Sequence, residues 1–216
     1  MNKLIDIQSG TIFVDGVRYN NNNYPPPNYL IKVMERCWAD CLLYKGAIRL
    51  GSLNSYRGWE NAILGDPNDG KGMLRMNTHP YEFGSSIPVY AWCAALLTIT
   101  PERINILADH GKYDCIVRVL QPSELIRRLH LAKPKDSYFH CAEVSYNRGE
   151  EVDKLTLNSQ RFHFNVFQKD LFFVDDQEYR IALIDVSHKP DRLDYIDLSI
   201  GDCSDIMAIE ELPGVG

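Results

Sequence analysis

Three carboxylates gather in front of an apolar segment late in the chain. Asp175, Asp176 and Glu178 precede or border Tyr179–Ile184 (YRIALI), whose composition is typical of a strand inside a sheet. If the strand starts ahead of them, alternation places Asp176, Glu178 and Arg180 on one face. Two carboxylates at this spacing can provide acid–base or electrostatic catalysis. They can equally be a solvated strand end that holds a structural ion pair, and both alternatives stay open.

A second polar group lies in Ala47–Gly58 (AIRLGSLNSYRG). Arg49 falls in a short apolar strand, and Ser52 and Tyr56 follow across a strand-to-helix passage. An arginine inside a strand is costly unless it is paired, so it requires an anionic partner. The partner is either a carboxylate such as Glu178, which would hold two strands together, or the phosphate of a ligand.

The ligand alternative leads to coherent chemistry on NAD. Breaking the nicotinamide–ribose bond passes through an oxocarbenium-like state, which a well-placed carboxylate stabilises. Glu178 would stabilise that state, Asp176 would orient the incoming nucleophile and Arg49 would hold the pyrophosphate. The residues expected to bind NAD are Arg49, Ser52, Tyr56 and Arg180.

Familiar metal, hydrolase and phosphate-loop motifs are absent from the sequence. It contains no CxxC, HxH, HExxH, GxSxG, GxGxxG or GxxxxGK[ST]. We therefore expect no metal site. In GDPNDGKG (65–72), Asp66 and Asp69 could hold a cation, but a surface turn is the favoured interpretation. A magnesium nuclease that uses these two aspartates with Asp176 and Glu178 is a further alternative.

The bulk composition indicates one folded domain. The chain has 216 residues, 45% of them hydrophobic, and a net charge of −6, which argues against a broad nucleic-acid-binding surface. Cys93, Cys115 and Cys141 have apolar neighbours, which is typical of buried free thiols in a reducing compartment. No signal peptide begins the chain, and the longest apolar run, Val89–Ile99, is too short to span a membrane. We expect a cytoplasmic protein with no membrane partner.

The elements that must position these residues predict an α+β fold. Strands outnumber helices without regular alternation, which favours a single mixed, mainly antiparallel sheet with a few short helices. We expect one domain over residues 1–216: an N-terminal hairpin and an Asn/Pro-rich loop (1–28), a core (29–186) and a C-terminal extension (187–216). The expected strands are 30–33, 47–52, 89–99, 115–120, 138–146, a piece near 155, 171–184 and two pieces in 193–211; the expected helices are 35–44, a short one from 54, another after 100, and 122–131, with 73–88 irregular.

Four segments carry a family resemblance. AIRLGSLNSYRG, GDPNDGKG, VYAWCAALLTI and FQKDLFFVDDQEYRIAL resemble, over residues 29–186, a group of uncharacterised bacterial proteins that often sit in phage-defence or toxin loci and have a late E-x-E-Y-R motif. Here that motif reads Asp176-Gln177-Glu178-Tyr179-Arg180, with aspartate in place of the first glutamate.

More distantly, the early strand arginine and the late carboxylate-x-glutamate resemble the arginine–serine–glutamate class of ADP-ribosyltransferases. This resemblance implies a fold like theirs and NAD as substrate. It places Arg49 on the phosphates, Glu178 at the catalytic position and Asp176 where the acceptor is oriented. The chain departs from that class in its serine strand, for which Ser85-Ser86 is the nearest match.

The leading hypothesis is therefore an ADP-ribosyltransferase-like toxin or phage-defence effector. Its expected partners are a macromolecular target and an antitoxin protein. A non-enzymatic sensor or binding module is the alternative from a different class, and in it Arg49 and Glu178 would form a structural pair. The magnesium nuclease is the third alternative.

Overall fold

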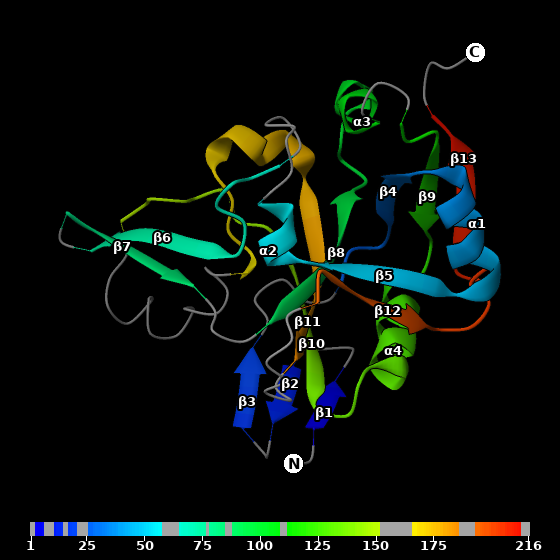
Figure 1. The fold of residues 1–216 in the computed structure, drawn as a ribbon, viewed down its shortest axis with the longest axis horizontal. Helices are drawn as coiled ribbons and strands as arrows, with labels where there is room; N and C mark the ends of the chain where they lie inside the picture. Colours follow the sequence, from blue (N-terminus) through cyan, green and yellow to red (C-terminus); the bar gives the residue numbers. More distant parts are fainter. Residues whose placement is uncertain are drawn as a thin grey trace.

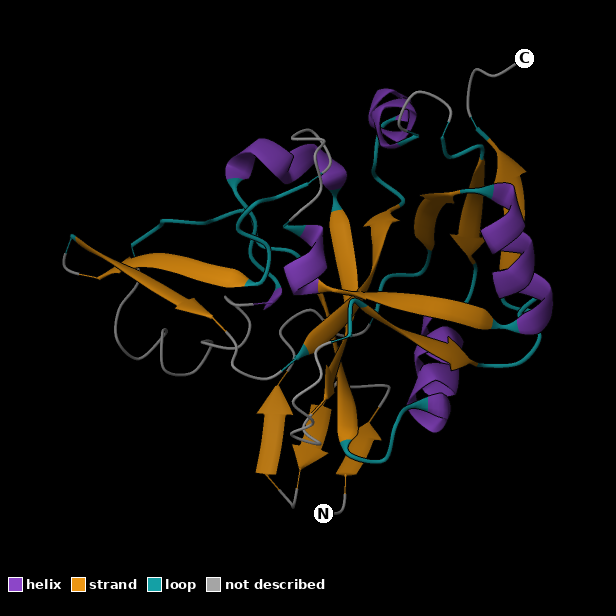
Figure 2. Cartoon of the chain, viewed as in Figure 1, coloured by secondary structure: helices purple, strands orange, loops and turns teal. Residues whose placement is uncertain are grey.

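The computed structural model describes residues 3–6, 11–14, 17–20, 26–57, 65–76, 78–84, 88–108, 112–151, 166–185 and 193–212. Over these residues the chain is an α+β protein with an eight-stranded antiparallel sheet and five helices, three of them with seven or more residues (Figures 1 and 2). The predicted fold class is confirmed at this level. Within the described part, no helix is long and apolar enough to cross a membrane.

The main sheet collects strands from residue 30 to residue 211. Its strands are β4 (Leu30–Met34), β5 (Ala47–Ser52), β8 (Val89–Leu96), β9 (Cys115–Val119), β10 (Ser137–Glu143), β11 (Glu178–Asp185), β12 (Tyr195–Ser199) and β13 (Met207–Glu211). The order is β10-β11-β8-β4-β9-β13, with β5 paired to β8 and β12 paired to β5. The two expected strand pieces in the tail are confirmed, and both belong to this sheet.

The sheet divides along one edge of β8. Residues 90–91 pair with residues 51–52 of β5, whereas residues 95–96 pair with residues 30–31 of β4. Residues 92–94 lie between these two pairings and opposite β11. The strands β4 and β5 therefore separate at this point, which we call the fork.

Short helices with clear end signals connect the strands. They are α1 (Arg36–Lys45), α2 (Leu53–Tyr56), α3 (Pro101–Leu107), α4 (Pro122–Ala132) and the 3₁₀ helix η2 (Leu171–Asp176). Proline occupies the first turn of α3 and α4, where its missing N–H costs nothing. Gly46 ends α1 in the left-handed conformation, at φ 61°.

The core lies on both faces of the two central strands. On one face Trp92, Tyr179 and Ile181 pack with residues of α1 and α4, and on the other Ala91 and Ala182 pack in a second cluster. Because both faces are covered, β8 and β11 have nearly continuous apolar sequences instead of alternating ones. The strand expected over 89–99 is confirmed as β8, which ends at Leu96.

Two local expectations are wrong. Within residues 73–88, which were expected to be irregular, the described part is largely a hairpin, since β6 (Lys71–Met76) and β7 (His79–Gly84) pair antiparallel. One of the buried positions of β6 is Gly72. Because glycine has no apolar side chain, the sequence does not show the alternation of apolar and polar residues that would predict a strand. The expected strand over 171–184 begins only at Glu178, because η2 precedes it and Gln177 adopts a left-handed conformation, at φ 48°.

The N-terminal strands form a separate three-stranded antiparallel sheet, β1 (Lys3–Asp6), β2 (Thr11–Val14) and β3 (Val17–Asn20). It extends the expected hairpin by one strand. Four features lie outside the described residues: Ser9-Gly10 and Asp15-Gly16, whose residue types are typical of turns, the serines Ser85-Ser86, and the strand expected near residue 155.

The turn after α1 gives a test of the fold. A side chain at Gly46 would overlap the backbone of Gly201, and φ there is positive. Gly149 also has a positive φ, of 82°, but its missing Cβ would meet nothing within 4 Å. We expect Gly149→Ala to cost about 1–2 kcal/mol from backbone strain alone. Gly46→Ala should cost about 3 kcal/mol or more, because strain and overlap combine. Urea denaturation measures both, and equal losses would contradict this packing.

Candidate functional site

A cleft of about 540 Å³ opens at the fork. Its lining includes residues 31–34 of β4 and the following Glu35, residues 47–49 and Gly51 of β5, and residues 92–95 of β8. Further lining comes from Trp38, Arg49 and Tyr195, and from Asp66, Asp69, Lys169, Asp176 and Glu178. The fork therefore brings together residues that are far apart in the sequence.

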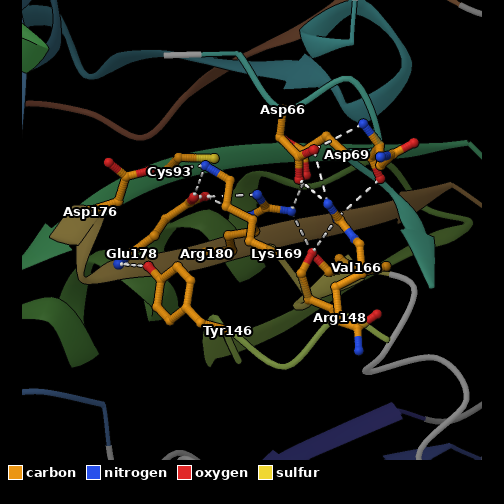
Figure 3. A network of polar contacts seen from close by, with 12 residues as sticks. Asp66, Asp69, Cys93, Tyr146, Arg148, Val166, Lys169, Asp176, Glu178 and Arg180 are labelled. Atoms are coloured by element: carbon orange, nitrogen blue, oxygen red, sulfur yellow. Dashed lines mark hydrogen bonds and ion pairs between the residues drawn. The ribbon is translucent and has the colours of Figure 1, made fainter. Parts of the chain in front are cut away.

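Six charged residues form one chain of ion pairs against the cleft. Figure 3 shows Asp69, Lys169, Asp176, Glu178 and Arg180 of this chain. Arg180 contacts Asp69 at 2.7 Å and Glu178 at 2.5 Å. Lys169 contacts Glu178 at 2.8 Å and Asp176 at 3.2 Å, and Arg103 contacts Asp176 at 2.5 Å. Each of these side chains is at most 10% exposed. We call this set, three carboxylates and three cations, the buried ion network.

Arg180 explains why the network exists. It lies in the middle of β11 with a side chain that is 0% exposed, and an unpaired buried charge costs several kcal/mol. Glu178, two residues earlier, lies on the same face of β11 and provides one partner. Asp69 provides the second partner from the turn before β6, and the backbone carbonyl of Val166 accepts a further bond at 2.7 Å.

Asp176 joins the network from outside the strand. The expectation that alternation within one strand aligns Asp176 with Glu178 is wrong, because Asp176 ends η2. The left-handed Gln177 turns the chain between them. Lys169 brings the two carboxylates together by contacting both. Asp176 and Glu178 therefore lie close together as expected, but Lys169 and the end of η2 bring them together, and not alternation along one strand.

A neighbouring pair secures the acidic turn. Arg148 contacts Asp66 at 2.8 Å and donates to the backbone carbonyls of Asn68 and Gln168. Asp66 and Asp69 are 2% and 4% exposed, so the surface-turn interpretation is wrong. Turn-forming residues indicated the turn itself, but its burial depends on the arginines that reach it from distant segments.

The charges of the network shift its titration. Burial opposes the ionised form of Glu178, but the positive charges of Arg180 and Lys169 outweigh it and lower the pKa of that carboxyl. Burial likewise opposes the charged form of Lys169, yet the nearby carboxylates, Glu178 foremost, raise its pKa. For Asp69 burial is the largest cause, and the pKa is raised. Glu178 and Lys169 are therefore both charged at neutral pH.

Arg49 does not belong to this network. Its side chain is 48% exposed, contacts Asp197 at 2.8 and 2.9 Å, and lies over the rings of Tyr195 and Trp38 at 3.7 and 5.4 Å. Arg49 has the carboxylate partner that a strand arginine was expected to require, but this partner is Asp197 and not Glu178, because the position of Arg49 in β5 faces outward. It does not pair with Glu178, although both residues line the cleft.

The other predicted binding residues have different positions. Tyr56 lines the cleft, donates to the carbonyl of Ala91 at 3.2 Å and packs over Gly51, where a Cβ would lie 2.6 Å from its hydroxyl. Ser52 caps α2 by accepting from the backbone N–H of Asn54. Neither Ser52 nor the fully buried Arg180 is among the residues that line the cleft.

Sequence reasoning missed Lys32 and gave Lys169 no role. Lys32 lines the cleft from β4, donates to the carbonyl of Cys93 at 2.6 Å and lies 5.1 Å from the centre of the Trp92 ring. The available signal was a single lysine inside the apolar run of β4 (LIKVM), by the argument applied to Arg49.

The carboxylates of the site face cations and not one another. In the described part of the chain no three His, Cys, Asp or Glu residues are placed to hold a metal ion. No protein-family model, curated protein or solved structure matches the chain. The family resemblance and the activities inferred from it stay predictions.

Loss of Arg180 should destabilise the fold far more than loss of Arg49. Arg180→Met leaves Glu178 and Asp69 short of a buried partner, so we expect a loss of about 3–5 kcal/mol. Arg49→Met removes a pair that is about half exposed, and should change stability by about 1 kcal/mol or less. Urea denaturation compares the two variants. Similar losses would show that the network does not hold β11 in place.

The lowered pKa of Glu178 predicts a pH dependence. Its contribution to stability is present above the unfolded pKa of about 4.3 and is lost as the pH falls toward the lower pKa of the folded state. Glu178→Gln should therefore be less stable than the wild type at pH 7, with a gap that narrows below about pH 4.3. Unfolding curves between pH 7 and pH 3 measure this gap. A gap independent of pH would mean that the carboxylate is not ionised in the fold.

Proposed function

We propose that the protein cleaves the nicotinamide–ribose bond of NAD and transfers ADP-ribose to a macromolecule, as a toxin or phage-defence effector. The observation that carries this proposal is that one cleft is lined by an ionised Glu178, by Arg49 and by the aromatic side chains Tyr56 and Trp92. Its volume lies in the range of small-molecule sites, about 300–1,000 Å³.

Glu178 is suited to stabilise positive charge on a sugar. A carboxylate offers about four acceptor positions, and the contacts with Arg180 and Lys169 use three of them. The remaining position can face a ribose whose C1′ gains positive charge as the bond to nicotinamide breaks. The two cations fix the orientation of the carboxylate and keep it ionised, which preorganises it for this role.

The proposed reaction is a substitution at C1′. The C1′–N bond breaks and its electron pair leaves with nicotinamide as a neutral base. An acceptor oxygen or nitrogen on the target forms the new bond to C1′ and releases a proton. Asp176 is the nearby carboxylate that would orient this acceptor, and for that role it must exchange one contact, with Lys169 or Arg103.

A non-enzymatic binding module is the second candidate. The observation that favours it is the balance of the network, in which each carboxylate contacts at least one cation. Such a set can serve purely to hold β11, η2 and the acidic turn together. Arg49 also has protein partners for its charge and its flat face, in Asp197, Tyr195 and Trp38.

An assay with labelled NAD and cell lysate tests the enzyme directly. We expect the wild type to release nicotinamide and to label a macromolecule, and Glu178→Gln to reduce both by about a hundredfold or more because the developing charge loses its stabiliser. Glu102→Gln, on the exposed first turn of α3, is the matched control and should retain the activity.

The fold of each variant is verified by circular dichroism at the assay temperature, since Glu178 also supports stability. A folded wild type that consumes no NAD in the presence of lysate would reject the enzyme and favour the binding module. A folded Glu178→Gln variant with full activity would remove Glu178 from the mechanism.

A further inference from the structure

Lys32 differs from the other cations of the cleft. Lys32, Arg49 and Lys169 all line it. Arg49 is paired with Asp197, and Lys169 with Asp176 and Glu178. Within the described residues, no carboxylate lies within ion-pair distance of Lys32, although Glu35 and Asp194 also line the cleft.

The fork determines where the ammonium of Lys32 lies. Cys93 is in the stretch of β8 between the pairings with β5 and β4, and its carbonyl accepts from the Lys32 ammonium at 2.6 Å. The Trp92 ring lies 5.1 Å from the same nitrogen. An ammonium carries three donors, and only one is used by this carbonyl, which leaves donors for a ligand in the cleft.

The charge of Lys32 is undercompensated in the absence of a ligand. At the acidic end of the cleft, Asp66, Asp69, Asp176 and Glu178 are matched by Arg148, Arg180, Lys169 and Arg103. Among the described residues, Lys32 directly contacts a backbone carbonyl and an aromatic face, and Glu178 acts on it from beyond ion-pair distance. Burial accordingly lowers its pKa, against the raising effects of Cys93 and Glu178. A partly buried charge in this state is stabilised by an incoming anion.

We propose that Lys32 is the anion-binding residue of the cleft and holds the phosphate of a phosphorylated nucleotide, with the pyrophosphate of NAD lying against Lys32 instead of Arg49. The inference rests on the proposed function for its ligand class, and it moves the phosphate site from β5 to β4. Lys32 has free donors and no carboxylate within ion-pair distance among the described residues, whereas the charge of Arg49 is already matched by Asp197.

Calorimetric titration with ADP and with adenosine tests the inference without any bond cleavage. The wild type should bind ADP more tightly than adenosine. Lys32→Met should weaken the affinity for ADP by about tenfold to a hundredfold, which is the loss expected for one charge-assisted hydrogen bond. The affinity for adenosine should stay unchanged. Lys32→Arg should retain most of the ADP affinity. Lys45→Met, an exposed lysine at the end of α1, is the matched control for loss of one charge.

A thermal melt separates a ligand role from a structural one. Lys32→Met removes an undercompensated charge but also the donor to the Cys93 carbonyl, so the shift that ADP causes is the readout: ADP should raise the melting temperature of the wild type and not that of Lys32→Met. A lysine that served only to cap the Cys93 carbonyl would leave the rise with ADP unchanged in Lys32→Met, and that result would overturn the inference.

The outcomes distinguish this inference from the proposed function. If ADP binding depends on Lys32 but NAD is not consumed, the phosphate site at Lys32 is supported and the proposed enzymatic function is rejected. If Lys32→Met consumes NAD with an unchanged KM, the proposed enzymatic function is supported and the phosphate site at Lys32 is rejected. If Arg49→Met loses affinity for ADP and Lys32→Met does not, the phosphate binds at Arg49 and the inference is wrong. A wild type that does not bind ADP would also overturn the inference.

Discussion

Burial of the Arg180 guanidinium is the constraint on which this site depends. The strand β11 is covered on both faces, so a charge in its middle must find its partners inside the protein. Two carboxylates meet it, one from the same strand and one from the turn before β6. The second cation on Glu178 is Lys169, which in turn contacts Asp176, and Arg103 completes the series. One buried arginine thereby ties α3, η2 and the acidic turn to the central strand.

The fork is the second structural condition for the cleft. Because β8 exchanges β5 for β4 as its partner, a short stretch of its edge lacks strand pairing on that side and a cavity opens there. Buried backbone carbonyls require donors, and the Lys32 side chain supplies one to Cys93. The same break in pairing therefore creates the space for a ligand and brings a cation into it. The buried ion network supplies the opposite end of that space.

Local signals predicted many elements of the fold. The helix that ends at Gly46, the strand at 47–52 and the proline-started helix at 122 follow from capping and composition, which act over a few residues. The site was harder, because burial of a charge depends on which strands cover it. One signal in the sequence was usable. The positions of AIRLGS alternate between exposed and buried, whereas YRIALI is apolar apart from Arg180 and is buried throughout. The requirement for an anionic partner therefore applied to Arg180, and not to Arg49. The partners Asp69, Lys169 and Arg103 come from segments that only the tertiary fold brings together.

The charged residues of this cleft differ in whether they have a partner of opposite charge. Those of the buried ion network have one and stabilise the fold, whereas Lys32 lacks one among the described residues and is the residue proposed to bind a ligand. The buried ion network is balanced, so its net contribution offsets the desolvation of its members and maintains the arrangement of β11. A residue kept only for the fold should be balanced in the same way. Lys32 is not, since it costs desolvation energy and receives a carbonyl and an aromatic face in return. The proposed anion would use the donors of this ammonium that the Cys93 carbonyl leaves free, and would supply the negative charge that its direct contacts lack.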